Sequence, residues 1–172
     1  LNRTFGIKMG GKAGQFGIDE EGLSEAVQAI VAHPGELAFR GIHIYAGSQC
    51  FDPAGVVEGV KDTFRIVREI ESSTPLVCRA INLGGGFGVS HIDSHRELDL
   101  AVLASELRPI VHAFIESSSV QRKIVFELGR YLTATAGIYV SRVISSKSSR
   151  GKEYFMVDGG LHHHLAAAGT FG

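Results

Sequence analysis

The sequence predicts an α/β fold in which helices connect the strands of a parallel sheet, followed by an antiparallel hairpin. Between residues 23 and 127, segments with apolar residues at helical spacing alternate with short apolar runs typical of buried strands. After Gly137 the alternation stops, and two strand-like runs follow with only a polar turn between them. Repeated β–α–β order indicates a parallel sheet, because parallel strands need a long crossover connection.

The first predicted helix lies near residues 23–31, where apolar residues recur at helical spacing: Leu23, Ala26, Val27, Ile30 and Val31. His-Pro-Gly at 33–35 ends this helix, since proline and glycine both interrupt helical backbone. The next run, LAFRGIHIYAG, predicts a strand over residues 39–46 and then a loop.

Asp52 and Pro53 mark the start of the second predicted helix, as N-cap and first helical residue, and this helix runs to about Glu71. The run PLVCRAINL predicts a second strand, over residues 76–83. A third helix is expected from His95 to Glu116, kinked or restarted near the proline at 109. The run KIVFEL predicts a third strand, over 123–127.

The chain changes character after the third strand. The runs IYVSRVISS and EYFMVDG are joined by KSSRGK, which is typical of a hairpin turn and not of a helical crossover. We therefore place a domain boundary near Ala134 to Gly137, and predict one domain over 1–135 and another over 136–172.

Composition excludes several classes of function. A net charge of −1 and an isoelectric point near 6.8 give no basic surface for nucleic acid. Two cysteines in 172 residues do not make a disulfide framework, which favours a reducing, cytoplasmic location. No apolar stretch is long enough to span a membrane, and no signal peptide is visible. The chain starts with Leu1, and we expect it to be part of a longer protein.

Three loops at the carboxyl ends of the predicted strands carry polar groups or bare backbone: YAGSQ at 45–49, GGGFG at 84–88 and ELGRY at 127–131. In parallel α/β architectures, ligands bind at these strand ends. Ser48 offers a hydroxyl, the glycines offer backbone N–H groups, and Arg130 offers a guanidinium. Together these groups describe a phosphate site.

The triple glycine alone is a weak signal. It fits neither the dinucleotide fingerprint, because the last required glycine is replaced by Val89, nor a nucleotide P-loop, because no Lys-Ser or Lys-Thr follows. A purely structural tight turn is the alternative interpretation of these glycines. For Glu127 the alternative is a surface carboxylate, with Arg130 as its ion-pair partner.

Four motifs resemble, in order and spacing, the fold-type III pyridoxal-phosphate decarboxylases: GIHIYAGSQ, INLGGGFG, FELGRYLTATAGIYVSRV and FMVDGG. These enzymes include the diaminopimelate, ornithine and carboxynorspermidine decarboxylases. The resemblance implies the later part of a (β/α)8 barrel over 1–135 and the first strands of a C-terminal β-domain over 136–172. It also implies a homodimer that decarboxylates an amino acid. The end of the chain most resembles a bacterial subgroup associated with exosortase gene clusters.

The resemblance also implies roles for individual residues. The backbone N–H groups of Gly84, Gly85 and Gly86 would bind the phosphate of pyridoxal 5′-phosphate, together with the residues Ser48 and Arg130. Glu127 would face the pyridine nitrogen. Such a carboxylate keeps that nitrogen protonated, which makes the ring a better electron sink and favours decarboxylation.

The sequence departs from the family pattern at several positions. Tyr45 stands where the family has a histidine stacked on the cofactor, so an aromatic face is kept without histidine's proton chemistry. Ala166 stands where diaminopimelate decarboxylases have a substrate-binding arginine, which puts that substrate in doubt. None of the lysines lies in the family's cofactor-binding context A-x-K-A-N, and neither Cys50 nor Cys78 matches its distal cysteine motif. We therefore expect this chain to be inactive alone.

The histidines do not predict a metal site. His162, His163 and His164 are consecutive, so their side chains would alternate between the two sides of a strand. His91 and His95 have a helical metal-ligand spacing but no accompanying cysteine or carboxylate motif. Two further hypotheses remain beside the decarboxylase: a noncatalytic relative that binds a partner subunit, and an unrelated α/β module that binds a phosphate such as a sugar phosphate.

Overall fold

The computed structural model describes residues 7–8, 15–90 and 97–163. The chain divides into two compact units, Leu1–Tyr131 and Leu132–Gly172. Within the described residues, no helix has the length and apolar character needed to cross a membrane.

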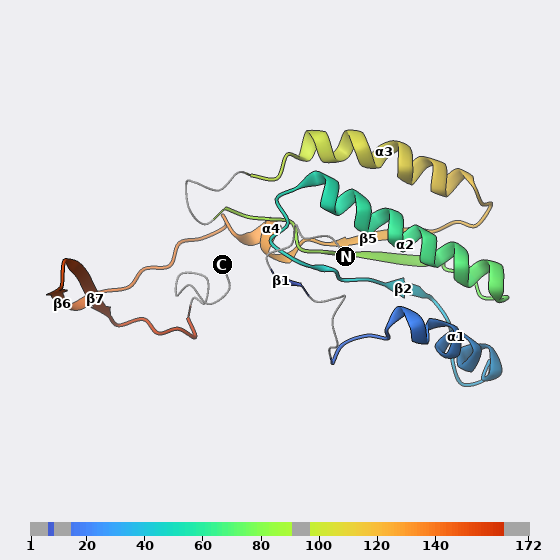
Figure 1. Cartoon of the computed structure of the whole chain (residues 1–172), viewed down its shortest axis with the longest axis horizontal. Coiled ribbons are helices and arrows are strands. Elements are labelled where there is room, and N and C mark those ends of the chain that lie inside the picture. Colours follow the sequence, from blue (N-terminus) through green and yellow to red (C-terminus); the bar gives the residue numbers. More distant parts are fainter. Residues whose placement is uncertain (1–6, 9–14, 91–96, 164–172) are drawn as a thin grey trace. The chain divides into compact units, whose positions relative to one another are not determined.

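The first unit is built on a parallel sheet of three strands in the order β2-β4-β5 (Figure 1). The strands are β2 (Gly41–His43), β4 (Ala80–Gly85) and β5 (Lys123–Glu127), and both neighbouring pairs are parallel. The predicted parallel arrangement is therefore confirmed. β2 is shorter than expected, although the N–H of Ile44 still donates to the carbonyl of Asn82 at 3.0 Å.

The second predicted helix is confirmed as α2 (Pro53–Ser73), with its expected cap. The Asp52 carboxylate accepts a hydrogen bond from the N–H of Ala54 at 3.1 Å, which satisfies one of the free donors of the first turn. The buried face of α2 carries Val60, Phe64 and Val67 at helical spacing, as the sequence pattern predicts.

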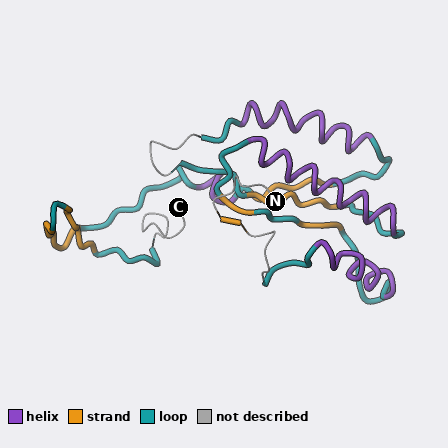
Figure 2. The backbone as a smooth tube through the Cα atoms, viewed as in Figure 1, coloured by secondary structure: helices purple, strands orange, loops and turns teal. Residues whose placement is uncertain are grey.

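The other helices are α1 (Leu23–Ala32), after a 3₁₀ turn at Glu20–Gly22, and α3 (Leu100–Glu116). α3 starts later than expected because Asp99 caps it, accepting hydrogen bonds from two backbone N–H groups. α2 and α3 lie side by side along the sheet (Figure 2). The rings of Phe64 and Phe114 stack between them, with their centroids 3.8 Å apart.

Besides the 3₁₀ turn, three short elements were not predicted. β1 (Ile7–Lys8) and β3 (Gly47–Ser48) form a two-residue antiparallel pair, and α4 (Gly129–Thr133) follows β5 directly. Elements this short carry no hydrophobic period, so the sequence pattern could not indicate them. β3 and α4 both belong to segments expected as ligand-binding loops.

An ion pair between Glu71 of α2 and Arg122, the residue before β5, lies at the amino-terminal ends of β4 and β5. Both Nη atoms of Arg122 donate to the carboxylate of Glu71, at 2.6 and 2.9 Å, and Nη1 also donates to the carbonyl of Cys78 at 2.8 Å. The N–H of Cys78 donates to the same carboxylate at 2.8 Å. Since the Arg122 side chain is only 3% exposed, this pair fastens α2 to the entry of both strands.

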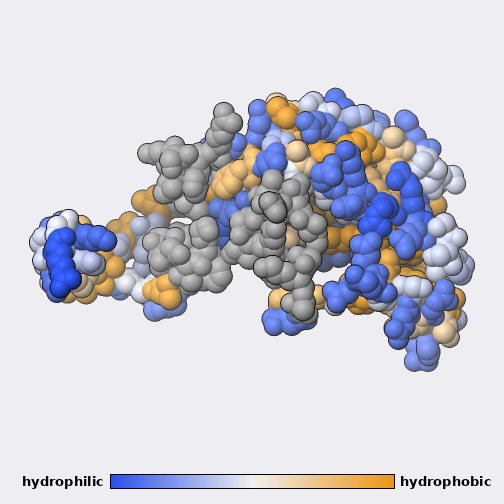
Figure 3. All heavy atoms as spheres, viewed as in Figure 1, coloured by the Kyte–Doolittle hydropathy of each residue, from blue (hydrophilic) through white to orange (hydrophobic). Residues whose placement is uncertain are grey.

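The second unit contains a hairpin of β6 (Val143–Ser149) and β7 (Lys152–Val157), which confirms the predicted antiparallel pairing. Arg150 and Gly151 form the turn with φ of +52° and +77°, the left-handed backbone of a two-residue hairpin turn. The polar turn residues form the hydrophilic tip of the hairpin in Figure 3. β6 begins at Val143, five residues after the start of the apolar run that predicted it.

Candidate functional site

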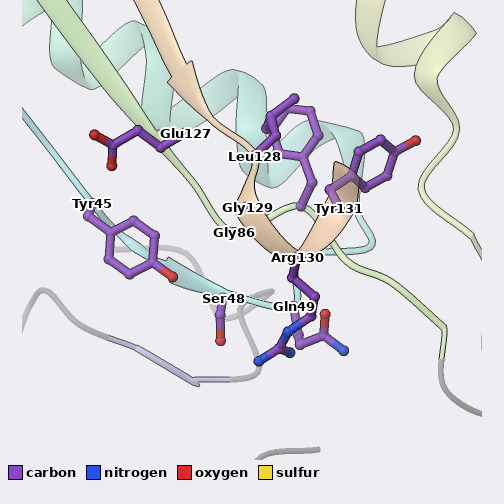
Figure 4. A pocket seen from close by; sticks show the side chains of 10 residues that line it. Tyr45, Ser48, Gln49, Gly86, Glu127, Leu128, Gly129, Arg130 and Tyr131 are labelled. Carbon is purple, nitrogen blue, oxygen red and sulfur yellow. The ribbon is translucent and has the colours of Figure 1, made fainter. Parts of the chain in front are cut away.

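A cavity of about 200 Å³ lies at the carboxyl ends of the three parallel strands (Figure 4). It is lined by Tyr45, Ser48, Gln49, Gly86, Phe87, Glu127, Leu128, Gly129, Arg130 and Tyr131. All three loops singled out in the sequence therefore contribute to one cavity. Of the residues expected at the site, Gly84 and Gly85 are not among those lining it.

One side of the cavity carries a hydroxyl and a cation. Ser48 comes from β3, and Arg130 comes from the first turn of α4. Figure 4 shows the guanidinium extending to the side of the cavity where Ser48 and Gln49 lie. Among the described residues, no carboxylate lies within ion-pairing distance of Arg130. The alternative interpretation of Arg130 as partner of Glu127 is therefore not what the structure shows.

Glu127 is held by the two neighbouring strands instead. Nδ2 of Asn82 donates to its Oε1 at 2.8 Å, and Nε2 of His43 lies 3.4 Å from its Oε2. The side-chain Oδ1 of Asn82 in turn accepts a hydrogen bond from the N–H of Gly84 at 2.9 Å. Both the Glu127 and His43 side chains are about half exposed, at 51% and 52%. The carboxylate is thus oriented while still open to the cavity.

Asn82 was not singled out from the sequence, and the contact of His43 with Glu127 was not foreseen. The pairing register of the parallel strands is the signal that could have indicated both residues. His43 pairs with Asn82 across the parallel sheet, and a shift in register brings Gly85 opposite Glu127. Polar residues at the last positions of adjacent parallel strands meet at one edge of the sheet.

The glycines of the second loop have a packing reason that sequence reasoning underestimated. A Cβ at Gly85 would overlap the carbonyl oxygen of Glu127, and one at Gly86 would overlap the carbonyl oxygen of Gly47. Gly84 has φ of +67°, and a Cβ there would lie 2.5 Å from the carbonyl oxygen of Ile44. Close approach of the neighbouring strands thus requires all three glycines, whether or not their N–H groups also bind an anion.

The rest of the cavity wall is aromatic. Tyr45 is 38% exposed, and in Figure 4 its ring lies between Glu127 and Ser48. Phe87 is buried beneath the cavity and makes edge-to-face contacts with Phe126 and Tyr131, with ring centroids 5.8 and 5.7 Å apart. The cavity therefore combines an aromatic face, a carboxylate on one side and a cation with a hydroxyl on the other.

The described residues contain no cluster of three or more His, Cys, Asp or Glu that could hold a metal ion. His91, His95, His164 and Ala166 lie outside the described part of the chain. Cys50 and Cys78 are buried and are not joined in a disulfide, and burial raises the pKa of Cys78 to about 11, which keeps its thiol protonated at neutral pH.

Residues 3–134 match the model of the pyridoxal binding domain of pyridoxal-dependent decarboxylases. An L-glutamyl-[BtrI acyl-carrier protein] decarboxylase from Niallia circulans is 39% identical, over 99% of this chain and 40% of that protein. Diaminopimelate decarboxylase from Bacillus subtilis is 30% identical, over 94% of this chain and 38% of that protein. The chain thus spans about 40% of the length of these curated relatives.

Solved structures agree with the fold. A crystal structure of diaminopimelate decarboxylase superposes with a TM-score of 0.78 at 25% identity, covering 94% of this chain and 37% of that one. The Helicobacter pylori enzyme, complexed with L-lysine, gives 0.74 at 22% identity, covering 96% and 39%. The predicted α/β fold of the barrel type is confirmed, and the chain belongs to the family of pyridoxal-dependent decarboxylases, whose cofactor is pyridoxal phosphate.

Proposed function

We propose that the complete protein containing this chain is a pyridoxal-phosphate-dependent decarboxylase of an amino acid. The observation that carries the proposal is the arrangement of opposite charges around one cavity, with the carboxylate of Glu127 and the guanidinium of Arg130 both in its wall. The cofactor has complementary ends, an anionic phosphate and a ring nitrogen that can be protonated. The donor set of the cavity therefore fits the cofactor of the family.

Ser48 and Arg130 form the proposed phosphate end. A guanidinium without a carboxylate partner among the described residues is available for an anion, and a charge-assisted hydrogen bond to phosphate is stronger than a neutral one. We assign backbone N–H groups of the Gly84–Gly86 loop to the same phosphate, with Gly86 nearest because it lines the cavity. The aromatic ring of Tyr45 offers a flat surface for the pyridine ring to stack on.

Glu127 forms the proposed ring-nitrogen end. When bound, the cofactor supplies an electron sink that accepts the electron pair left by the departing carbon dioxide. A carboxylate at the ring nitrogen keeps a proton there and strengthens that sink. Asn82 contributes by holding one carboxylate oxygen, while the other oxygen lies beside His43.

The names of two relatives suggest two substrates, a glutamyl group attached to a carrier protein and free diaminopimelate. We favour the first because identity is higher to the glutamyl-carrier decarboxylase, 39% against 30%. Comparing turnover of carrier-attached glutamate with that of diaminopimelate distinguishes them.

The proposal further includes a homodimer located in the cytoplasm, and places 1–135 in the barrel and 136–172 in the β-domain.

The decisive experiment is Glu127→Gln in the complete protein. The amide is nearly isosteric and still hydrogen-bonds, but it does not stabilise the protonated ring nitrogen. We expect cofactor affinity to stay largely intact while the rate constant for decarboxylation falls by roughly a hundredfold or more, equivalent to a few kcal/mol. The rate constant should fall more than the Michaelis constant rises, because the interaction acts mainly in the transition state. Normal turnover in this variant would contradict the assignment.

A further inference from the structure

Gln49 is a polar residue in an unfavourable setting. It follows β3 directly and is only 7% exposed, although a glutamine is usually found at the surface. Its backbone has φ of +55°, a left-handed conformation that is uncommon for residues other than glycine. Burial and strain at the rim of a ligand cavity indicate a specific task for its side chain.

The Gln49 amide pairs with the backbone of a second loop. Its Nε2 donates to the carbonyl of Val89 at 3.0 Å, and its Oε1 accepts from the N–H of Val89 at 3.0 Å. The side chain thereby satisfies both backbone groups of one residue, as a neighbouring strand would. Gln49 and Val89 are 40 residues apart in the sequence. Their two hydrogen bonds therefore join two loops that are separated by a whole helical crossover.

Backbone hydrogen bonds continue the same contact. The N–H of Cys50 donates to the carbonyl of Gly86 at 2.9 Å, and the N–H of Gly88 donates to the carbonyl of Cys50 at 2.8 Å. Cys50 and Phe87 consequently form an isolated parallel bridge beyond the ends of the named strands. The segments 47–50 and 86–89 are therefore fastened together as one unit.

This unit carries two of the groups assigned to the phosphate. Ser48 immediately precedes Gln49, and Gly86 begins the second segment. The fit between the segments is tight, because a Cβ at Gly86 would overlap the carbonyl oxygen of Gly47. A small shift of one segment against the other would move the Ser48 hydroxyl relative to the backbone of Gly86 and spoil a shared anion site.

We propose that Gln49 is a positioning residue that locks these two segments into the geometry that binds the cofactor phosphate. The inference rests on the proposed function, since it concerns the same cavity. Gln49 acts through Ser48 and the glycine loop, and its side chain needs no contact with reacting atoms. A merely structural glutamine would instead stabilise the fold without favouring one end of the cofactor over the other.

The test measures dissociation constants for pyridoxal phosphate and for pyridoxal, which lacks the phosphate, in the complete protein. The variant Gln49→Met keeps the length of the side chain and removes both hydrogen bonds. We expect it to weaken pyridoxal phosphate binding at least about tenfold and pyridoxal binding less than about threefold. Comparing the two ligands on one protein preparation removes the effect of any unfolded fraction.

Two further variants complete the design. Gln49→Asn keeps a neutral amide but shortens the side chain by one methylene, so it should show the same selective loss and serves if the methionine variant does not fold. Gln28→Met makes the same chemical change at an exposed position of α1 and should alter neither constant. Equal losses for both ligands, or no loss for either, in the Gln49 variants would overturn the positioning role. A wild-type protein without preference for pyridoxal phosphate would overturn the phosphate site of the proposed function itself.

Discussion

Arg130 and Glu127 lie three residues apart, yet the structure gives them different surroundings. Glu127 ends β5 and is held by Asn82 and His43, whereas Arg130 belongs to α4. The turn between them separates a carboxylate that already has polar neighbours from a cation with no carboxylate partner in the described residues. A simple surface ion pair would neutralise both groups, but this arrangement leaves each charge available to a ligand.

Arg130→Ala in the complete protein should therefore weaken cofactor binding more than tenfold. A charge-assisted hydrogen bond contributes about 1.5–3 kcal/mol, and removing the side chain deletes this contact. Titration of the apoprotein with pyridoxal phosphate, followed by absorbance, measures the change. Arg108→Ala, at an exposed position of α3, serves as the control and should bind the cofactor normally. Unchanged affinity in the Arg130 variant would rule out its assigned role.

At the scale of elements, the ion pair of Glu71 and Arg122 fixes α2 to the strands. Burial raises the pKa of Glu71, but the hydrogen bonds from Arg122 and the N–H of Cys78 outweigh it, so this pKa lies below its ordinary value of 4.5. A carboxylate with a lowered pKa stabilises the fold above its ordinary pKa and loses that contribution as pH falls through its folded value. The pair should thus contribute at pH 7 and fade in acid.

Glu71→Gln should lower the free energy of unfolding by about 3 kcal/mol at pH 7, because it leaves the buried Arg122 guanidinium without its counter-charge. The difference in unfolding free energy between variant and wild type should shrink as pH falls below 4.5 and through the lowered pKa of the folded protein, where the wild-type carboxylate also becomes protonated. Urea denaturation at several pH values measures this. Glu69→Gln removes an exposed partner of Arg65 and should have little effect. If the loss of unfolding free energy did not depend on pH, the charge of Glu71 would not be its cause.

The elements also show what a sequence pattern can predict. Helical periodicity and the Asp52-Pro53 pair predicted α2 almost to the residue, because capping and burial of one face are local properties. The start of α3 was missed by five residues, since the helix begins at Leu100, capped by Asp99, and not at His95. α4 was missed entirely, because five residues make little more than one turn and leave no periodic signal.

At the scale of the whole molecule, the parallel order of strands explains why the site could be located from sequence. Loops after consecutive parallel strands meet at one edge, so Tyr45, Ser48, Glu127 and Arg130 were expected together and line one cavity. Gln49 and Asn82 were not singled out, because their importance depends on the register between strands and on burial. Neither property is visible along a single chain.

The covalent attachment of the cofactor gives a last prediction at this scale. Decarboxylases of this family hold pyridoxal phosphate through a lysine, and the sequence has none in the expected context. Among the described residues, no lysine lines the cavity: Lys61 pairs with Glu58 on α2, and Lys123 begins β5 at the opposite end of the strand. The 172-residue chain should therefore release no carbon dioxide from carboxyl-labelled amino acid, whereas under the proposed function the complete protein should release it. Borohydride should also fix no cofactor to a lysine at the cavity. Turnover by the chain alone would show that the Glu127 and Arg130 groups suffice without this lysine, and would contradict the expectation that the chain is inactive alone.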